Sequence, residues 1–147
     1  MNPTTTIRAL LLAVALAVPA LSTAGDTPNI TPGLWEYSHT VTMEGGPEMP
    51  PQHETEQECV TAADLQNADA MIDAPEGCTL DHVDMRSDGA EFTMTCTDPE
   101  SGGNFVTEAQ MRFMGDRSES VMHSTVDTPM GTMKVRVEIE GRRIGDC

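Results

Sequence analysis

Strict alternation of apolar and charged residues marks the segment Met133-Lys134-Val135-Arg136-Val137-Glu138-Ile139-Glu140. Successive side chains of a β-strand point to opposite faces of the sheet, so this period of two is typical of a strand. The segment therefore predicts a strand over residues 132–140, with Met, Val and Ile pointing inward and Lys, Arg and Glu pointing to solvent.

Similar segments recur along most of the chain. Further strands are expected over residues 33–43, 52–59, 79–86, 90–97, 104–114 and 118–128. Short turn sequences separate most of them, for example Asp88-Gly89, which suits the positive φ of a hairpin turn. Thr61 is expected to cap one short helix over Ala62–Ala70. The pattern predicts an all-β fold with one short helix, built as an antiparallel curved sheet or a small up-and-down barrel.

The composition restricts the class of protein. A chain of 147 residues allows one domain. Lys and Arg number 8 against 24 Asp and Glu, which gives a net charge of −16. Nucleic acid and anionic membranes repel such a chain, so neither is expected as a partner. Aromatic residues make up only 3% while Met numbers 11, so Val and Met are expected to fill the core.

The N-terminal segment is predicted to be a secretory signal peptide over residues 1–24. Arg8 precedes an apolar run over Ala9–Val18, and Ser22-Thr23-Ala24 supplies small residues for cleavage after Ala24. The run is shorter than the about 20 apolar residues that a membrane-spanning helix needs, and no other segment is expected to span a membrane. Residues 25–147 then form a single β-rich domain, which is expected to be periplasmic or secreted.

Four cysteines, Cys59, Cys78, Cys96 and Cys147, lie in the predicted mature part. An even number in an exported chain favours two disulfides, and three connectivities exist. With Asp88-Gly89 as a two-residue loop, Cys78 lies three positions from the residue opposite Cys96 and on the other face, which disfavours that pair. Two connectivities remain, and the preferred one joins Cys59 with Cys78 and Cys96 with Cys147.

The methionines and histidines offer a metal-site hypothesis. One set flanks a Pro-rich loop, and the other surrounds a later turn: Met43, Met49 and His53, then Met122, His123, Met130 and Met133. Thioether and imidazole ligands suit Cu(I) in an oxidising compartment. Their spacing is irregular, and the strand positions of Met43 and Met133 fit an alternative interpretation in which Met fills the core.

Three motifs together resemble one known family. They are Pro32-Gly33-Leu34-Trp35-Glu36-Tyr37, Glu58-Cys59-Val60-Thr61-Ala62-Ala63-Asp64-Leu65 and Gly141-Arg142-Arg143-Ile144-Gly145-Asp146-Cys147. In this order, over residues 30–147, they resemble the bacterial domain-of-unknown-function family 3617. The resemblance implies a small exported bacterial protein, without the lipid-site Cys of some members. It implies no catalytic residue.

The functional prediction follows from these observations. We expect a non-enzymatic binding or envelope protein, with a small apolar ligand in a Met-lined concavity or a protein partner. We also expect a monomer without a cofactor. Two alternatives stay open: a Cu(I)-binding protein that uses the Met and His residues above, and a hydrolase without a recognisable motif.

Overall fold

The computed structural model describes residues 26–46, 48–67, 72, 74–99, 102–129 and 131–147. It contains seven strands and one helix, in the chain order β1 (Gly33–Glu44), β2 (Gln52–Val60), α1 (Ala62–Gln66), β3 (Cys78–Arg86), β4 (Gly89–Thr97), β5 (Asn104–Phe113), β6 (Arg117–Thr128) and β7 (Gly131–Gly145). The expected all-β fold with one short helix is confirmed. The predicted signal peptide over residues 1–24, with its cleavage site at Ala24, lies outside the described residues.

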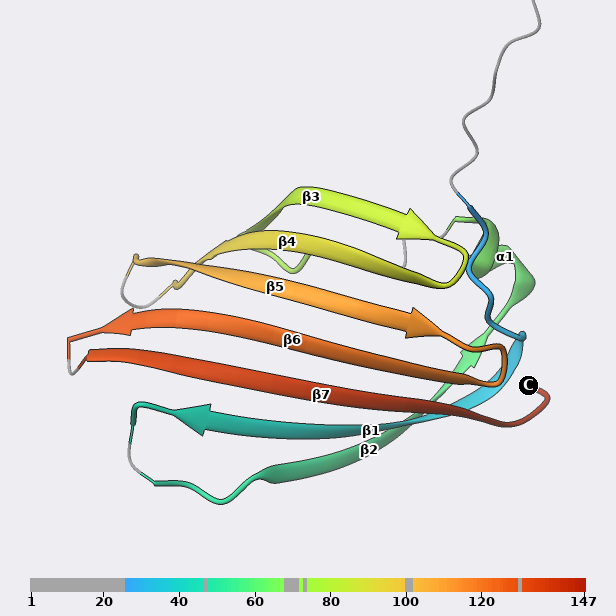
Figure 1. Ribbon diagram of the computed structural model, residues 1–147, viewed down its shortest axis with the longest axis horizontal. Helices are drawn as coiled ribbons and strands as arrows, with labels where there is room; N and C mark the ends of the chain where they lie inside the picture. Colours follow the sequence, from blue (N-terminus) through green and yellow to red (C-terminus); the bar gives the residue numbers. More distant parts are fainter. Residues whose placement is uncertain (1–25, 47, 68–71, 73, 100–101, 130) are drawn as a thin grey trace, which may run out of the picture.

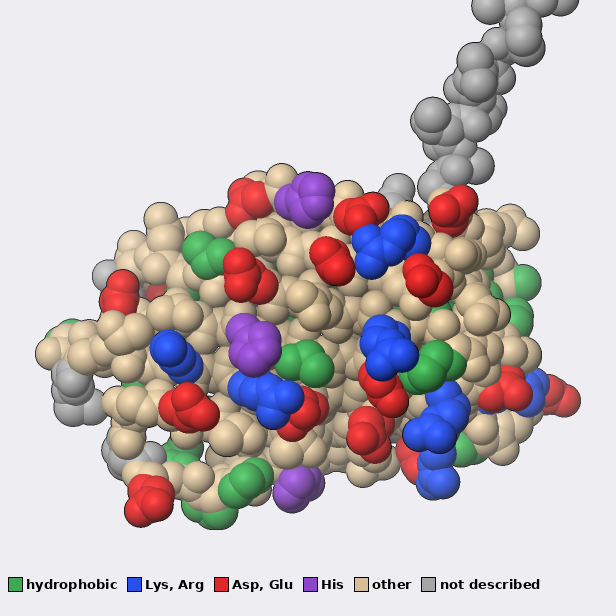
Figure 2. Space-filling model, in the orientation of Figure 1, with side chains coloured by type: hydrophobic (Ala, Val, Ile, Leu, Met, Phe, Trp, Pro, Cys, Tyr) green, Lys and Arg blue, Asp and Glu red, His purple; other side chains and the backbone are tan. Residues whose placement is uncertain are grey.

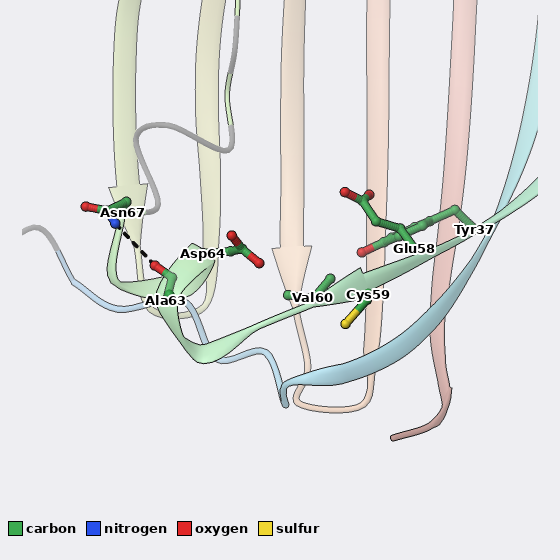
Figure 3. A pocket seen from close by; sticks show the side chains of 7 residues that line it. All are labelled: Tyr37, Glu58, Cys59, Val60, Ala63, Asp64 and Asn67. Atoms are coloured by element: carbon green, nitrogen blue, oxygen red, sulfur yellow. Dashed lines mark hydrogen bonds between the residues drawn. The ribbon is translucent and has the colours of Figure 1, made fainter. Parts of the chain in front are cut away.

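All seven strands form one antiparallel sheet in the order β2-β1-β7-β6-β5-β4-β3. The sheet is curved and stays open, with β2 and β3 as its edges, so the curved sheet is correct and the closed barrel is not formed (Figure 1). The end of β2 and helix α1 lie in front of the concave side of the sheet, and β3 is the opposite edge strand (Figures 1 and 3).

Side-chain alternation places the predicted apolar face on the concave side. Val137, Met122, Ala109 and Phe92 are directly opposite one another on four neighbouring strands. Strand β7 extends five residues beyond the expected Glu140, through Gly141 to Gly145. A Cβ at Gly141 would lie 2.7 Å from a ring carbon of Tyr37, so glycine lets the aromatic ring pack on this strand.

Most of the buried core lies at one end of the concave face, which we call the closed end. Here β1 and β6 begin, and β3 and β5 end. One cluster consists of Trp35, Val60 and Leu65, and the second consists of Ile72, Ala90 and Phe113. The N-terminal segment joins the turns of this end, because Asn29 N–H donates to the Ser87 carbonyl and the Asn29 carbonyl accepts from Gly115 N–H.

The opposite end, which we call the open end, is packed more loosely. It is where β1, β4 and β6 end and β5 and β7 begin. Its inward-facing apolar residues Met43, Val126, Met133 and Val135 are only half-buried. The same sheet face is therefore a closed core at one end and an accessible surface toward the other.

A capping box starts helix α1, as the sequence predicts for Thr61. The Thr61 hydroxyl accepts from Asp64 N–H at 3.2 Å, and the Asp64 carboxylate accepts from Thr61 N–H at 2.8 Å. The described helix ends at Gln66 with Asn67 as its C-cap, whereas the sequence predicts a helix to Ala70. Residues 68–70 lie outside the described residues. Leu65 is the helix residue that enters the core.

Both expected disulfides are present, but the preferred pairing is wrong. Cys59 is bonded to Cys147, and Cys78 is bonded to Cys96. The first disulfide joins the end of β2 to the C-terminus at the closed end, and the second joins β3 to β4 at the open end. Each end of the sheet thus has one covalent link.

The β3–β4 hairpin explains this error. Its turn residues are Ser87 and Asp88, because Gly89 pairs with Arg86 inside the ladder. A Cβ at Gly89 would lie 2.3 Å from the Met111 carbonyl, so this glycine allows close approach of β5 rather than a positive φ. A register shift between Leu80 and His82 adds one more position. Together the two shifts place Cys78 directly opposite Cys96.

The convex face carries the charged side chains of the sheet in mixed signs (Figure 2). Arg142 Nε donates to Glu36 at 3.0 Å, Arg136 pairs with Glu138 at 2.7 Å, and Arg112 pairs with Glu119 at 3.6 Å. These pairs are exposed, so each contributes little to stability. They neutralise part of the convex face, while the concave face remains mostly apolar.

Candidate functional site

The concave face holds an apolar groove of about 420 Å³. Four central strands and the connection between α1 and β3 supply its lining, which consists of Ile72, Pro75, Phe92, Met94, Thr107, Met111, Ser120, Met122, Ser124, Val137 and Ile139. We call these residues the apolar groove. Its volume lies within the range of small-molecule sites. The expected Met-lined concavity is therefore present, with Met94, Met111 and Met122 among its walls.

The groove is accessible along its centre. Met111, Met122 and Val137 point to the concave side but are only half-buried. Ala109 on the same face is 2% exposed, because the larger side chains beside it cover it. Partly exposed apolar side chains in a contiguous concave patch are typical of a binding surface rather than of a finished core.

The few polar groups of the groove are satisfied within the protein. The hydroxyls of Thr107 and Ser124 are hydrogen-bonded to each other at 2.7 Å. Among the described residues, no buried side-chain nitrogen or oxygen lacks a hydrogen-bond partner. The groove therefore offers apolar contact without an unpaired buried polar group that would require a polar ligand.

A second pocket, of about 490 Å³, lies between β2 and helix α1. We call it the acidic pocket; its lining is Tyr37, Glu58, Cys59, Val60, Ala63, Asp64 and Asn67. Figure 3 shows the Tyr37 side chain beside Glu58, and the Asp64 carboxylate directed from helix α1 toward them. Tyr37 connects the two sites. It is next to His39 on the concave face of β1, and His39 is opposite Ile139 of the apolar groove.

Two groups of the acidic pocket have shifted pKa values. Burial, together with the charges of Glu58 and Glu56, raises the pKa of Tyr37 to about 12. The hydrogen bonds from the Thr61 side chain and backbone lower the pKa of Asp64, so this carboxylate is ionised at neutral pH. The Tyr37 hydroxyl is therefore neutral in a region of negative potential.

Three glutamates continue the acidic surface along the β2 edge. Glu54, Glu56 and Glu58 lie opposite His39, Tyr37 and Trp35, so they share the concave face. We call these three residues the acidic rim. His39 Nε2 lies 2.9 Å from Glu56 Oε1. Glutamate at every second position of the sequence indicates that the three share one face, but only the pairing of β2 with β1 shows which face it is.

The structure separates the predicted metal ligands. Met43, Met122 and Met133 are on the concave face, whereas His53 and His123 are on the convex face, since His53 Nδ1 is 3.0 Å from Thr40 Oγ1 and His123 is opposite Arg136. Met49 is 42% exposed in the loop between β1 and β2. Met130 lies outside the described residues. Met122 and His123 thus do not converge, while Met43 and Met133 lie on neighbouring strands at the open end.

The acid, base and thiol groups are also dispersed. The four cysteines are consumed in disulfides, and no group of three or more His, Cys, Asp or Glu within the described residues has the geometry to hold a metal ion. His39 has a carboxylate partner, but His53 and His123 are on the opposite face of the sheet. None of the described helices is long and apolar enough to cross a membrane.

The fold and the sites define a disulfide-linked, open β-sheet protein with an apolar concave face and an acidic edge. A family model described as "Protein of unknown function (DUF3617)" matches residues 30–147, and the chain belongs to this family. The expected family is confirmed. No curated protein and no solved structure matches the chain. The family description names no activity.

Proposed function

We propose that this protein is a non-enzymatic binding protein that holds a small apolar ligand in the apolar groove. The observation that carries the proposal is the partial exposure of Met111, Met122 and Val137 on a concave face whose closed end is packed by two buried clusters. Bringing a ligand into the groove would remove this surface from water, at roughly 25 cal/mol per Å² of apolar area.

We further propose that the protein works outside the cytoplasm of a bacterium, in the periplasm or as a secreted protein. Two disulfides support this location, because such links persist in oxidising compartments. The predicted signal peptide supports it as well. N-terminal sequencing of the protein from its own host is expected to begin at Gly25; a chain retaining Met1 would contradict the export proposal.

The binding proposal is tested with a neutral fluorescent probe, N-phenyl-1-naphthylamine, titrated into the purified protein. We expect saturable fluorescence enhancement. The triple variant Met94→Gln/Met111→Gln/Met122→Gln keeps the side-chain length but makes the groove polar, and we expect about tenfold weaker binding. Native mass spectrometry of the protein from its own host is expected to show a co-purified organic mass.

The matched control changes the opposite face of the same strands. Val106 and Val121 lie on the convex side of β5 and β6, and Val106 is 44% exposed. Val106→Gln/Val121→Gln is expected to bind the probe as the original protein does. If probe binding is absent, or if both sets of variants weaken it equally, the groove is not the binding site.

A further inference from the structure

The two faces of the sheet differ in the sign of their charge. The cations that project from the convex face are Arg86, Arg112, Arg117, Lys134, Arg136 and Arg142. The remaining cation of the described residues, Arg143, lies at the closed end, where its Nε donates to the Pro32 carbonyl at 2.8 Å and its guanidinium pairs with Asp146. Arg143 is opposite Trp35 and therefore lies on the concave face, but its guanidinium is engaged at the closed end. The described strands place no other Lys or Arg on that face.

The acidic rim keeps much of its negative charge uncompensated. Among the described residues, only Glu56 of the three forms an ion pair, and its partner His39 is charged only when protonated. Residues two apart on one strand are about 7 Å apart, so Glu54, Glu56 and Glu58 repel one another along β2. The raised pKa of Tyr37, caused by burial and by Glu58 and Glu56, is a second sign of this potential.

The rim and the apolar groove lie on one continuous surface. Ile139 of the groove is opposite His39, and His39 is opposite Glu54. Two strand spacings separate β7 from β2, which is about 10 Å along the sheet. Moving from the groove to the rim, the surface thus changes from apolar, through an imidazole and a phenol, to carboxylates.

We propose that the ligand of the groove is a cationic amphiphile, with its alkyl chain on the apolar groove and a protonated amine at the acidic rim. This proposal rests on the proposed function and names the class of ligand. Charge complementarity selects an ammonium group, and no group of three or more His, Cys, Asp or Glu within the described residues has the geometry to hold a metal ion instead. A fatty acid or phospholipid anion would be repelled.

The experiment compares three ligands that share a ten-carbon chain: decylamine, decanol and decanoate, each measured by calorimetry below its micelle-forming concentration at pH 7. We expect decylamine to bind about tenfold more tightly than decanol, and decanoate to bind most weakly. The advantage of the amine is expected to shrink in 1 M salt, where the screening length is about 3 Å.

Two triple variants locate the cation site. Glu54→Gln/Glu56→Gln/Glu58→Gln removes the acidic rim and is expected to reduce decylamine binding to the level of decanol, leaving decanol binding unchanged. Glu44→Gln/Glu108→Gln/Glu140→Gln removes the same charge from the convex face, where all three are exposed, and is expected to keep the preference for decylamine. Both sets change exposed positions, and thermal unfolding checks that they fold.

The outcomes separate the two proposals. Equal binding of decylamine and decanol to the original protein, or equal effects of the two triple variants, overturns the cationic ligand while leaving the apolar groove as a binding site. Failure of all three ligands to bind overturns the proposed function as well. If a Lys-rich amphipathic peptide binds and decylamine does not, the surface serves a protein partner and the ligand proposal is wrong.

Discussion

The two ends of one concave face are built differently. At the closed end, Trp35 is 0% exposed and packs with Val60 and Leu65, while Phe113 packs with Ile72. At the open end, Cys96 is 3% exposed, but the inward-facing Met and Val side chains of β1, β6 and β7 are only half-buried. This chain, which is poor in aromatic residues, therefore completes its core at one end and leaves apolar surface accessible at the other.

The largest expected effect concerns the two disulfides, one at each end. In the chain-entropy model, the stabilisation grows with loop length, and the separations are 88 residues for Cys59–Cys147 and 18 for Cys78–Cys96. Cys59→Ser/Cys147→Ser is therefore expected to cost about 4.5 kcal/mol, and Cys78→Ser/Cys96→Ser about 3 kcal/mol. Urea unfolding monitored by circular dichroism measures both.

If the two free-energy costs came in the reverse order, the inferred difference between the two ends would be contradicted. If loss of Cys78–Cys96 costs more than loss of Cys59–Cys147, the open end contributes more to stability than its packing indicates. The connectivity itself is checked by a peptide map without reduction, which is expected to contain the Cys59–Cys147 and Cys78–Cys96 peptides. Either of the other two pairings would contradict the register of the β3–β4 hairpin.

The next effect compares a side chain of the closed end with one of the apolar groove. Trp35 is fully buried, and its indole N–H donates to the Thr31 carbonyl at 2.9 Å, so Trp35→Ala is expected to cost about 4 kcal/mol. Met122 is half-buried in the groove, so Met122→Ala is expected to cost about 1 kcal/mol. Equal losses in urea unfolding would show that the groove is part of a continuous core and not an accessible surface.

Much of the fold follows from local sequence, but the difference between its two ends does not. Alternation predicts which residues of β4, β5 and β7 face inward, and Thr61 predicts the start of α1. Which end is closed depends on contacts between Trp35, Val60 and Leu65, which come from three different elements. Such long-range packing has no local signal in a single sequence.

The disulfide pairing is a second feature that local sequence does not determine. The hairpin register can be predicted only if the turn is placed correctly. A glycine after Asp88 is typical of a turn residue, but Gly89 lies in the ladder, where the missing side chain allows β5 to approach closely. The β-bulge near Asp81 cannot be recognised from the order of apolar and polar residues in the sequence. The acidic rim is similar, because alternate glutamates predict a shared face but not its side of the sheet.

A smaller effect is expected at helix α1, which links β2 to the rest of the closed end. Thr61→Ala removes the capping hydroxyl and is expected to cost about 1 kcal/mol in urea unfolding. Asn67→Ala, at the other end of the helix, removes only one side-chain hydrogen bond to the Ala63 carbonyl, which is exposed. If Asn67→Ala costs as much as Thr61→Ala, capping is not what holds the helix.

The same variant changes the response to acid. Hydrogen bonds from Thr61 lower the pKa of Asp64, so the ionised carboxylate stabilises the fold above the ordinary pKa of aspartate. This stabilisation is lost as the pH falls through the lowered pKa. We expect the stability of Thr61→Ala to fall less steeply below about pH 4 than that of the original protein. Parallel curves would contradict the role of this contact.

The titration of Tyr37 tests the acidic edge beside the closed end. Tyr37 is the only tyrosine of the chain, so tyrosinate absorbance reports on it alone. Because its pKa is raised to about 12, its neutral form is favoured by folding. This contribution is complete below about pH 10, the ordinary pKa of tyrosine, and is lost as the pH rises toward 12.

Variants of the acidic rim decide how much of this shift comes from charge. Burial is the largest cause, so Glu56→Gln/Glu58→Gln is expected to lower the midpoint only part of the way toward the value of the urea-unfolded chain. The convex pair Glu108→Gln/Glu140→Gln is expected to leave it unchanged, since these residues face the opposite side of the sheet. An unchanged midpoint in the rim variant would mean that Glu56 and Glu58 create no potential at Tyr37. The attraction proposed for a cationic ligand would then lose its basis, although the apolar groove beside it would still be available to a neutral one.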